Sequence, residues 1–279
     1  MNKKLIFLDI DGTLTVPGTN VPPESALRAV RAAQAVGHKV VLCTGRNWDM
    51  LSPVMEYGFD GAVASGGGYV VCEGKVLYDC PMEPEKQEAA LRLLAENGVF
   101  RTIEAKDGTF GDEGMADFLG SVSGGNSELV RWRRAIEDSL NIRPMAQYDG
   151  RPIYKIVFMC REESQLEPAR KALGSDFRFL IQDALTPGCV NGELINLSFD
   201  KGTGVQQMAE AFGIPAEDTV GFGDSMNDLE MIRAVGTSVC MANGSPALQK
   251  ISDMVCPSVE EDGLAQAFEK LGLSGPESI

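Results

Sequence analysis

Short apolar runs alternate with longer amphipathic stretches at both ends of the chain, and this alternation restricts the possible folds more than any other sequence feature. The apolar runs have the length of strands and lie at Leu5 to Leu8, Lys39 to Cys43, Gly61 to Ala64, Thr219 to Phe222, Thr237 to Met241 and Asp253 to Cys256. Apolar residues three or four positions apart predict helices at Pro23 to Val36, Trp48 to Tyr57, Gly202 to Phe212, Met226 to Val235 and Val259 to Leu271. Strands that alternate with helices predict an α/β fold with a doubly wound parallel sheet.

The middle of the chain has a different pattern. It predicts a helix, a loop rich in glycine and aspartate, a second helix, and then strand, helix and strand, at Glu83 to Asn97, Asp107 to Gly125, Ser127 to Leu140, Ile153 to Cys160, Glu162 to Leu173 and Phe177 to Ile181. We therefore predict a core domain of residues 1–81 and 189–279, interrupted by an inserted α+β domain of residues 82–188.

The charge of the chain limits its partners. Forty acidic residues against 25 basic ones give a net charge of −15, which repels nucleic acids and anionic membranes and requires a cation wherever a phosphate binds. We therefore expect a metal ion, and neither nucleic acid nor membrane as a partner. No run approaches the roughly 18 apolar residues of a membrane helix, and Asp9 follows the N-terminus too closely for a secretory signal. We expect a cytoplasmic protein.

Cysteine and histidine usage excludes several kinds of catalysis. The seven cysteines never form a C-x-x-C pair, and we expect reduced residues of the core. The single histidine, His38, rules out multi-histidine zinc sites and leaves little room for serine-triad, cysteine-histidine or histidine-phosphate chemistry. Because His38 lies between a predicted helix and a predicted strand, we expect it at the surface.

Acidic and small polar residues follow three of the predicted strands, where ligands of a doubly wound sheet bind. They are Asp9 and Asp11 after the first strand, Thr44, Gly45 and Arg46 after the second, and Asp224, Asn227 and Asp228 after the fourth. If the chain stays extended, Asp9 and Asp11 share one small volume, which suggests a hard cation or one protonated carboxyl group. A turn closed by Asp-x-Asp-Gly is the alternative.

Other residues are of types that often bind phosphate. Thr44 and Gly45 stand at a strand-to-helix junction, and Lys201 opens a helix whose first amides are available to an anion. Gly221-Phe222-Gly223 begins like a dinucleotide fingerprint, but Met226 occupies the position of the third glycine. No Walker pattern occurs, so binding of a nucleoside triphosphate is not supported.

Four short motifs, in fixed order, resemble those of the haloacid dehalogenase superfamily of phosphotransferases. They are Asp9-Ile10-Asp11-Gly12-Thr13, Leu42-Cys43-Thr44-Gly45-Arg46, Lys201-Gly202 and Gly223-Asp224-Ser225-Met226-Asn227-Asp228. The long insert and the tail motifs at 241–244 and 261–264 are similar to the Cof-type branch, whose insert is an α+β cap. Two loops depart from that branch: Ser65-Gly66-Gly67 replaces Asn-Gly-Ala, and Met-Ala-Asn-Gly replaces Met-Gly-Asn-Ala.

The resemblance implies a phosphatase that uses Mg²⁺ and acts on a small phosphorylated metabolite such as a sugar phosphate. In such an enzyme Asp9 is the nucleophile and Asp11 the general acid and base. The metal ligands are a carboxylate oxygen of Asp9, the carbonyl oxygen of Asp11 and the carboxylate of Asp224, and Asn227 and Asp228 lie around the ion's water. Thr44, Gly45 and Lys201 bind the phosphoryl group.

A phosphomutase or phosphotransferase with the same aspartyl phosphate, and a non-catalytic protein that binds phosphorylated metabolites, are the alternatives. We expect a monomer or weak homodimer. Arg46 and Lys155 are candidates for contact with the rest of the substrate, although a strand lysine such as Lys155 is more often an exposed residue without such a role. We interpret Arg131-Trp132-Arg133-Arg134 as a mostly solvated helix face.

Overall fold

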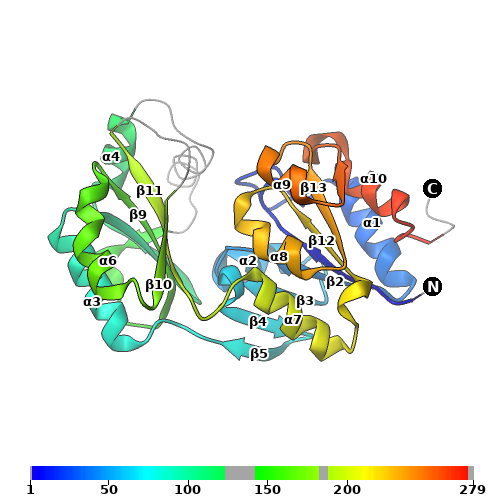
Figure 1. Ribbon diagram of the computed structural model, residues 1–279, viewed down its shortest axis with the longest axis horizontal. Helices are drawn as coiled ribbons and strands as arrows, with labels where there is room; N and C mark the ends of the chain where they lie inside the picture. Colours follow the sequence, from blue (N-terminus) through cyan, green and yellow to red (C-terminus); the bar gives the residue numbers. More distant parts are fainter. Residues whose placement is uncertain (1, 123–141, 182–187, 276–279) are drawn as a thin grey trace. The chain divides into compact units, whose positions relative to one another are not determined.

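The structure is a computed structural model that describes residues 2–122, 142–181 and 188–275 (Figure 1). The chain divides into two compact units. The first unit contains Met1–Arg46, Leu51–Asp79 and Phe199–Ile279, and the second contains Asn47–Met50 and Cys80–Ser198. The predicted helix from Ser127 to Leu140, with the basic run inside it, lies outside the described residues.

The first unit contains an eight-stranded sheet with the strand order β14-β13-β12-β1-β2-β3-β4-β5. Six neighbouring strands are parallel, namely β1 (Leu5–Leu8), β2 (Lys39–Cys43), β3 (Gly61–Ala64), β12 (Thr219–Gly223), β13 (Thr237–Met241) and β14 (Met254–Cys256). Two antiparallel strands, β4 (Tyr69–Cys72) and β5 (Lys75–Asp79), complete one edge. The predicted parallel α/β sheet is confirmed.

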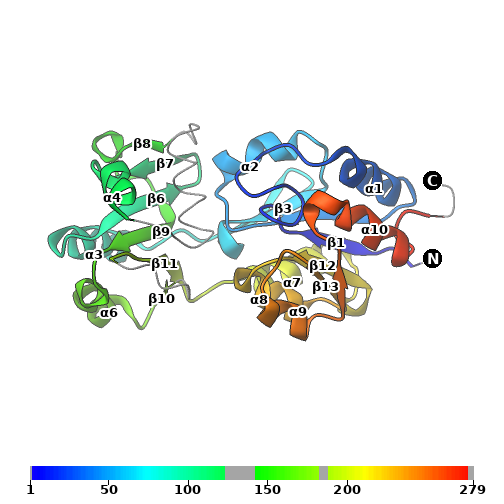
Figure 2. The ribbon, with the colours of Figure 1, turned by 90° about the horizontal axis from the view of Figure 1, so that it is seen from above.

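Helices cover both faces of this sheet. Figure 2 shows α1 (Glu24–Ala35) and α10 (Gly263–Lys270) on one side of the strands, and α7 (Lys201–Phe212), α8 (Leu229–Ala234) and α9 (Pro246–Ile251) on the other. A further helix, α2 (Trp48–Met55), begins in the segment that clusters with the second unit. Because both faces are covered, the central strands are apolar throughout, and all four residues of β1 are fully buried.

The register of the parallel strands aligns their carboxyl ends. Leu8 at the end of β1 lies opposite Leu42 of β2 and Phe222 of β12. The residues that follow, Asp9 after β1 and Asp224 after β12, are therefore placed at one edge of the sheet.

The second unit has its own sheet and its own core. The strand order is β10-β11-β9-β6-β7-β8, and only the β7–β8 pair is parallel. The strands are β6 (Phe100–Ala105), β7 (Gly108–Gly111), β8 (Ile142–Pro144), β9 (Ile153–Cys160), β10 (Phe177–Ile181) and β11 (Val190–Asn196). Helices α3 (Pro84–Glu96) and α6 (Glu167–Leu173) pack together, and their apolar residues share a cluster with Ile156 and Phe158 of β9.

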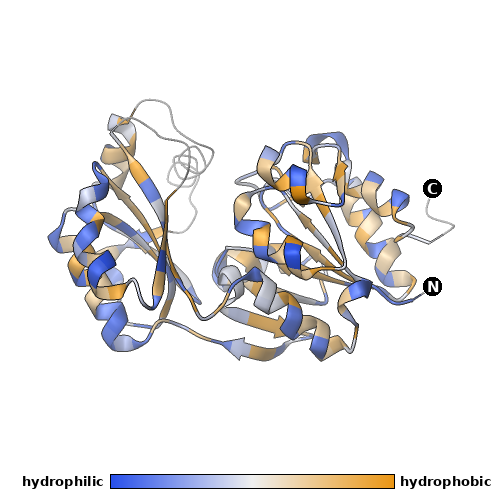
Figure 3. Cartoon of the chain, viewed as in Figure 1, coloured by the Kyte–Doolittle hydropathy of each residue, from blue (hydrophilic) through white to orange (hydrophobic). Residues whose placement is uncertain are grey.

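A smaller apolar cluster lies on the other side of β9. It joins α4 (Met115–Ser121) to Val157 and Met159, which alternate with the residues of the larger cluster. Figure 3 shows that the strands of both sheets are mostly hydrophobic, whereas the helices have mixed colours. Each unit therefore buries its own apolar residues.

Two predictions for the middle of the chain need correction. The expected loop from Asp107 to Gly125 contains β7 and α4, because Phe110 and Phe118 bury their rings in the unit. The chain was expected to return to the core at residue 189. In the structure β11 pairs with β9 and β10, and the first unit resumes at Phe199.

His38 was also predicted incorrectly. We expected a surface residue, but only 3% of His38 is exposed. The backbone N–H of Lys4 donates a 3.0 Å hydrogen bond to its Nδ1, which holds the ring under the start of β1. Burial, and the positive charge of Lys4, lower the pKa of His38.

Candidate active site

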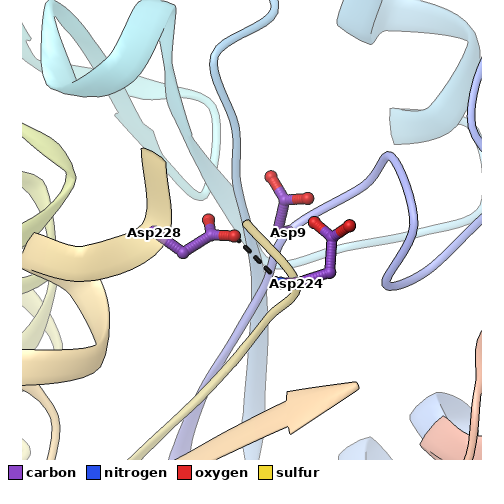
Figure 4. A group of neighbouring side chains, drawn as sticks. All are labelled: Asp9, Asp224 and Asp228. Atoms are coloured by element: carbon purple, nitrogen blue, oxygen red, sulfur yellow. Dashed lines mark hydrogen bonds between the residues drawn. The ribbon is translucent and has the colours of Figure 1, made fainter. Parts of the chain in front are cut away.

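Three carboxylates meet at the carboxyl edge of the parallel strands. Asp9 follows β1, Asp224 follows β12, and Asp228 ends the short 3-10 helix Met226–Asp228. Each offers an oxygen, and these oxygens lie within 4.8 Å of one another. Figure 4 shows the three side chains directed toward a common region. Two segments more than 200 residues apart in the sequence thus supply one acidic cluster.

Lys201 connects two of these acids. Its Nζ donates to Asp9 Oδ1 at 2.8 Å, to Asp228 Oδ1 at 2.6 Å and to Asn227 Oδ1 at 3.3 Å. Lys201 is the first residue of α7, whose N-cap Asp200 accepts a hydrogen bond from the backbone of Thr203. The cap fixes the start of the helix, and the lysine is held at 3% exposure among the acids.

The site contains three carboxyl groups and one ammonium group, and neighbouring charges shift the pKa values of Asp9, Asp224 and Lys201. Burial first, and then the charge of Asp228, raise the pKa of Asp9 to about 7 against the opposing effect of Lys201. Burial, followed by the charges of Asp9 and Asp228, raises the pKa of Asp224 to about 9. Although burial alone lowers the pKa of Lys201, Asp228 and Asp9 raise it well above its ordinary value. Asp9 and Asp228 are buried and Asp224 is partly buried, and one ammonium group would not balance the three carboxylates if all were ionised.

The donor set fits a small divalent cation. Converging carboxylate oxygens are the hard ligands that Mg²⁺ prefers, and a cation would supply positive charge beside them. Asp228 is less available as a direct ligand, because its Oδ2 accepts hydrogen bonds from the backbone N–H groups of Asp224 and Ser225 at 3.0 and 3.1 Å. These bonds hold the loop that presents Asp224.

Asp11 has different partners from Asp9. The extended conformation ends at Leu8, and the chain turns so that the N–H groups of Thr13 and Leu14 donate to the carbonyl of Ile10. The carboxylate of Asp11 lies against Arg46, at 2.8 Å for two atom pairs. The strand geometry on which the shared volume of Asp9 and Asp11 was conditional stops at Leu8, but the charge of Asp11 still raises the pKa of Asp9, so their proximity stays a prediction.

The loop after β2 is held by its neighbour after β3. Thr44 is buried, and its Oγ1 accepts a hydrogen bond from the N–H of Arg46 at 3.1 Å. The N–H of Ser65 donates to the carbonyl of Arg46 at 2.8 Å, and that of Gly66 donates to the carbonyl of Thr44 at 3.0 Å. Ser65 lies in the left-handed region, with φ of 51°, to make this contact. Gly45 lies between these anchored residues.

The loop after β13 braces two parts of the site that the sequence did not connect. Asn243 Nδ2 donates to the carbonyl of Gly12 at 2.8 Å, and the N–H of Ser245 donates to the carbonyl of Asp224 at 2.7 Å. Gly12 has a φ of 88°, and a side chain there would collide with the Asp224 carboxylate. The tail motif was identified from the sequence, but its role as a support for Gly12 and Asp224 was not.

Lys155 lies in the second unit and is buried. Its Nζ is 2.8 Å from Glu193 Oε1 and 3.4 Å from Glu104 Oε1, and its side chain is 7% exposed. The interpretation of Lys155 as an ordinary exposed strand residue is wrong, because β9 lies inside the sheet and both neighbouring strands carry a glutamate toward it. Contact of Lys155 with a substrate stays a prediction.

Comparison with known proteins gives the family. The model of the haloacid dehalogenase-like hydrolases matches residues 6–268. YkrA of Bacillus subtilis (strain 168) is 31% identical over 98% of this chain and 99% of its own length. The pyridoxal phosphate phosphatase YbhA of Escherichia coli (strain K12) is 24% identical over 95% of this chain and 97% of its own.

A solved structure gives the same result for the fold. A protein from Geobacillus kaustophilus HTA426 superposes with a TM-score of 0.79 at 28% identity, covering 98% of this chain and 100% of the other. The chain belongs to the haloacid dehalogenase-like hydrolases, and it is a phosphatase of that superfamily. The resemblance of the four motifs is thereby confirmed. Among the described residues, no helix combines the length and apolar character needed to cross a membrane.

Proposed function

We propose that this phosphatase hydrolyses the phosphate monoester of a small metabolite, such as a sugar phosphate, through an aspartyl phosphate on Asp9. The observation that carries the proposal is the group of Asp9, Asp224 and Asp228 at the carboxyl edge of the sheet, with Lys201 bound to Asp9 and Asp228. Three carboxyl groups would repel a negatively charged phosphate ester. The ester can therefore bind beside them only if cations, such as the Lys201 ammonium group and a metal ion, offset that repulsion.

In the first step Asp9 acts as the nucleophile. Its Oδ2 forms a bond to phosphorus as the bond from phosphorus to the ester oxygen breaks, while Oδ1 keeps its hydrogen bond to Lys201. For this step one oxygen of Asp11 exchanges its hydrogen bond from Arg46 for a proton, and it gives that proton to the departing oxygen, so that an alcohol leaves. The covalent intermediate divides one difficult displacement into two easier ones.

In the second step water attacks the phosphorus of the aspartyl phosphate. Asp11, now a carboxylate, takes a proton from that water, and the bond between Asp9 and phosphorus breaks. Inorganic phosphate leaves, and both aspartates return to their starting states. One residue thus serves as acid and then as base.

Other residues of the first unit bind the phosphoryl oxygens. Lys201 lies within hydrogen-bonding distance of Asp9 and offers its charge to the transferred group, and the Thr44 hydroxyl and the Gly45 amide lie in the loop after β2. We assign the metal ligands to Asp9, the carbonyl of Asp11 and Asp224, with Asn227 and Asp228 around the ion's water. When bound, Mg²⁺ would neutralise part of the charge on the phosphoryl group.

The second unit, in this proposal, recognises the remainder of the substrate. The proposed substrate class, a small phosphorylated metabolite, is supported by the relative named as a pyridoxal phosphate phosphatase. Lys155 is a candidate for contact with that remainder.

The test is a screen of phosphorylated metabolites, with pyridoxal phosphate and hexose phosphates included, that measures released phosphate and sugar isomers together. We expect free phosphate in the presence of Mg²⁺, no phosphate in excess chelator, recovery when Mg²⁺ is restored and poor recovery with Ca²⁺, which is larger and less strictly octahedral. An isomerised sugar phosphate without free phosphate would make the protein a mutase. Full activity in excess chelator would contradict the metal assignment.

A further inference from the structure

The guanidinium group of Arg46 makes a contact that the proposed mechanism does not use. Its Nε donates to Asp11 Oδ2 and its Nη2 donates to Asp11 Oδ1, both at 2.8 Å. The two side chains are 9% and 16% exposed. A planar fork that binds both oxygens of a carboxylate fixes its orientation as well as its position.

The remaining donors of Arg46 hold the turn that follows Asp11. Nη1 donates to Asn20 Oδ1 at 2.5 Å, and Nη2 donates also to the carbonyl of Thr19 at 3.1 Å. The N–H of Gly18 donates to Asp11 Oδ1 at 3.0 Å. One side chain therefore connects the Asp11 carboxylate with the turn at residues 18–20.

The backbone of Arg46 is fixed to the loop that is proposed to bind phosphate. Its N–H donates to Thr44 Oγ1, and its carbonyl accepts from the N–H of Ser65. The backbone of Arg46 thus belongs to the same short, hydrogen-bonded segment as Thr44, while its guanidinium group binds Asp11. The arrangement fixes the spacing between a phosphate-binding hydroxyl and a carboxylate that exchanges protons.

We propose that Arg46 is a positioning residue for proton transfer: its two-point contact sets the place of the Asp11 carboxylate relative to the loop that binds the phosphoryl group. The inference rests on the proposed function, because it takes Asp11 as the group that exchanges the proton. It differs from the expectation that Arg46 touches the substrate, since here Arg46 acts through Asp11.

The first experiment replaces Arg46 by lysine, which keeps the charge but loses the fork. Proton transfer matters most for a poor leaving group, so turnover of a hexose phosphate should fall about 10- to 100-fold. With p-nitrophenyl phosphate, the initial burst of nitrophenol should change much less, because nitrophenolate departs with little help from a proton. An equal loss for both substrates would overturn the proposal, since it would indicate a general structural defect.

The second experiment is a double-mutant cycle with Asp11→Asn. If Arg46 acts through Asp11, adding Arg46→Lys to Asp11→Asn should cause no further loss of hexose phosphate turnover. Losses that multiply would overturn the inference and leave the proposed function intact. Undiminished turnover of Asp11→Asn alone would instead contradict the role of Asp11 in the proposed function.

Two further variants serve as controls, with thermal unfolding measured for each. Asn20→Ala removes one partner of Arg46 but leaves the fork in place, and it should show the same dependence on the leaving group with a smaller loss. It therefore keeps the proposal testable if Arg46→Lys fails to fold, and equal loss with both substrates would overturn the proposal here too. Arg28→Lys alters an exposed arginine of α1 that is paired with Glu24, and it should leave both rates unchanged.

Discussion

Each unit contains a buried lysine held between two carboxylates, and the two lysines differ in where the chain places them. Lys201 stands at the start of a helix and contacts Asp9 and Asp228, at the carboxyl edge of a parallel sheet. Lys155 lies within strand β9 and contacts residues of the two neighbouring strands, Glu104 and Glu193. Similar ion pairs can thus belong to an edge where ligands bind or to the body of a sheet.

The position of each lysine relative to its sheet determines what its ion pairs can do. At the strand ends a third carboxyl group, Asp224, lies beside the acids that contact Lys201, and burial, followed by the charges of Asp9 and Asp228, raises its pKa to about 9; a cation bound there would favour its ionised form. In the second sheet, Lys155 lies on β9, which pairs with a strand on each side, and these two strands carry Glu104 and Glu193. We therefore expect replacement of Lys201 to affect activity first and replacement of Lys155 to affect stability first.

The largest effect is expected for the acid beside Lys201. Asp9→Asn should lower turnover by at least about 10³-fold, because the nucleophile is lost. The variant should still fold, since removal of one charge from a crowded carboxylate group relieves repulsion. Steady-state phosphate release and thermal unfolding measure the two parts. Turnover near that of the wild type would mean that another residue is the nucleophile.

Replacement of Lys201 should have the next largest effect. Lys201→Met should reduce turnover about 10²- to 10³-fold, because the transferred phosphoryl group and Asp9 lose a cation at hydrogen-bonding distance. The assay should use the folded fraction, verified by circular dichroism, with Lys201→Arg as a variant that keeps the charge. A change confined to thermal stability would place Lys201 in the same category as Lys155.

Replacement of Lys155 should mainly lower stability. Lys155→Met removes the ammonium group that contacts two largely buried glutamates, and the free energy of unfolding should fall by about 3–5 kcal/mol. The turnover number of the folded fraction should change by less than about threefold. Urea unfolding measures the first quantity, and steady-state kinetics, which give kcat and KM, measure the second. If KM rises while stability is retained, Lys155 is a substrate contact.

A matched variant separates charge from packing at that place. Lys155→Met combined with Glu104→Gln and Glu193→Gln also removes the two negative charges that Lys155 contacts and should recover most of the lost stability. No recovery would indicate that the lysine stem, and not its charge, is what the sheet requires.

The smallest effect concerns the buried histidine under β1. Burial lowers the pKa of His38 in the folded state below its ordinary value of 6.5. As the pH falls through that ordinary value, the unfolded chain binds a proton that the folded chain does not, so stability is complete above it and is lost below it. His38→Asn should remove this contribution, so the free energy of unfolding should change less between pH 7 and 5 than in the wild type; this range includes the ordinary histidine pKa of about 6.5. An unchanged pH dependence would contradict this assignment.

The sequence predicted the parallel core well because local signals and tertiary position agree there. The strands β1, β2 and β3 occupy the predicted residues, since a continuous apolar run is what a strand covered on both faces requires. Asp9, Thr44, Lys201 and Asp224 were identified because strand ends and helix starts are visible in the sequence. Their roles in catalysis stay predictions.

Pairings between distant segments were not visible. Nothing near β11 shows that it joins β9 and β10, so the return to the first unit was placed too early. The pair of Arg46 with Asp11 bridges 35 positions, and no helical or strand spacing indicates it. The burial of His38 and Lys155 depends on strands that lie beside them only in the folded chain. Such contacts are tertiary, and local patterns do not contain them.

The short segment Asn47–Met50 bears on how such a protein can be recombined. It follows Arg46 directly, yet it belongs to the second unit, where Asn47 Nδ2 donates to the carbonyl of Ala105 at 2.9 Å and to Thr109 Oγ1 at 3.0 Å. A chimera that exchanges only Cys80–Ser198 with a relative would therefore separate Asn47 from its native acceptors. The exchangeable module consists of two pieces of sequence, and a graft that respects it must carry residues 47–50 together with the large insert.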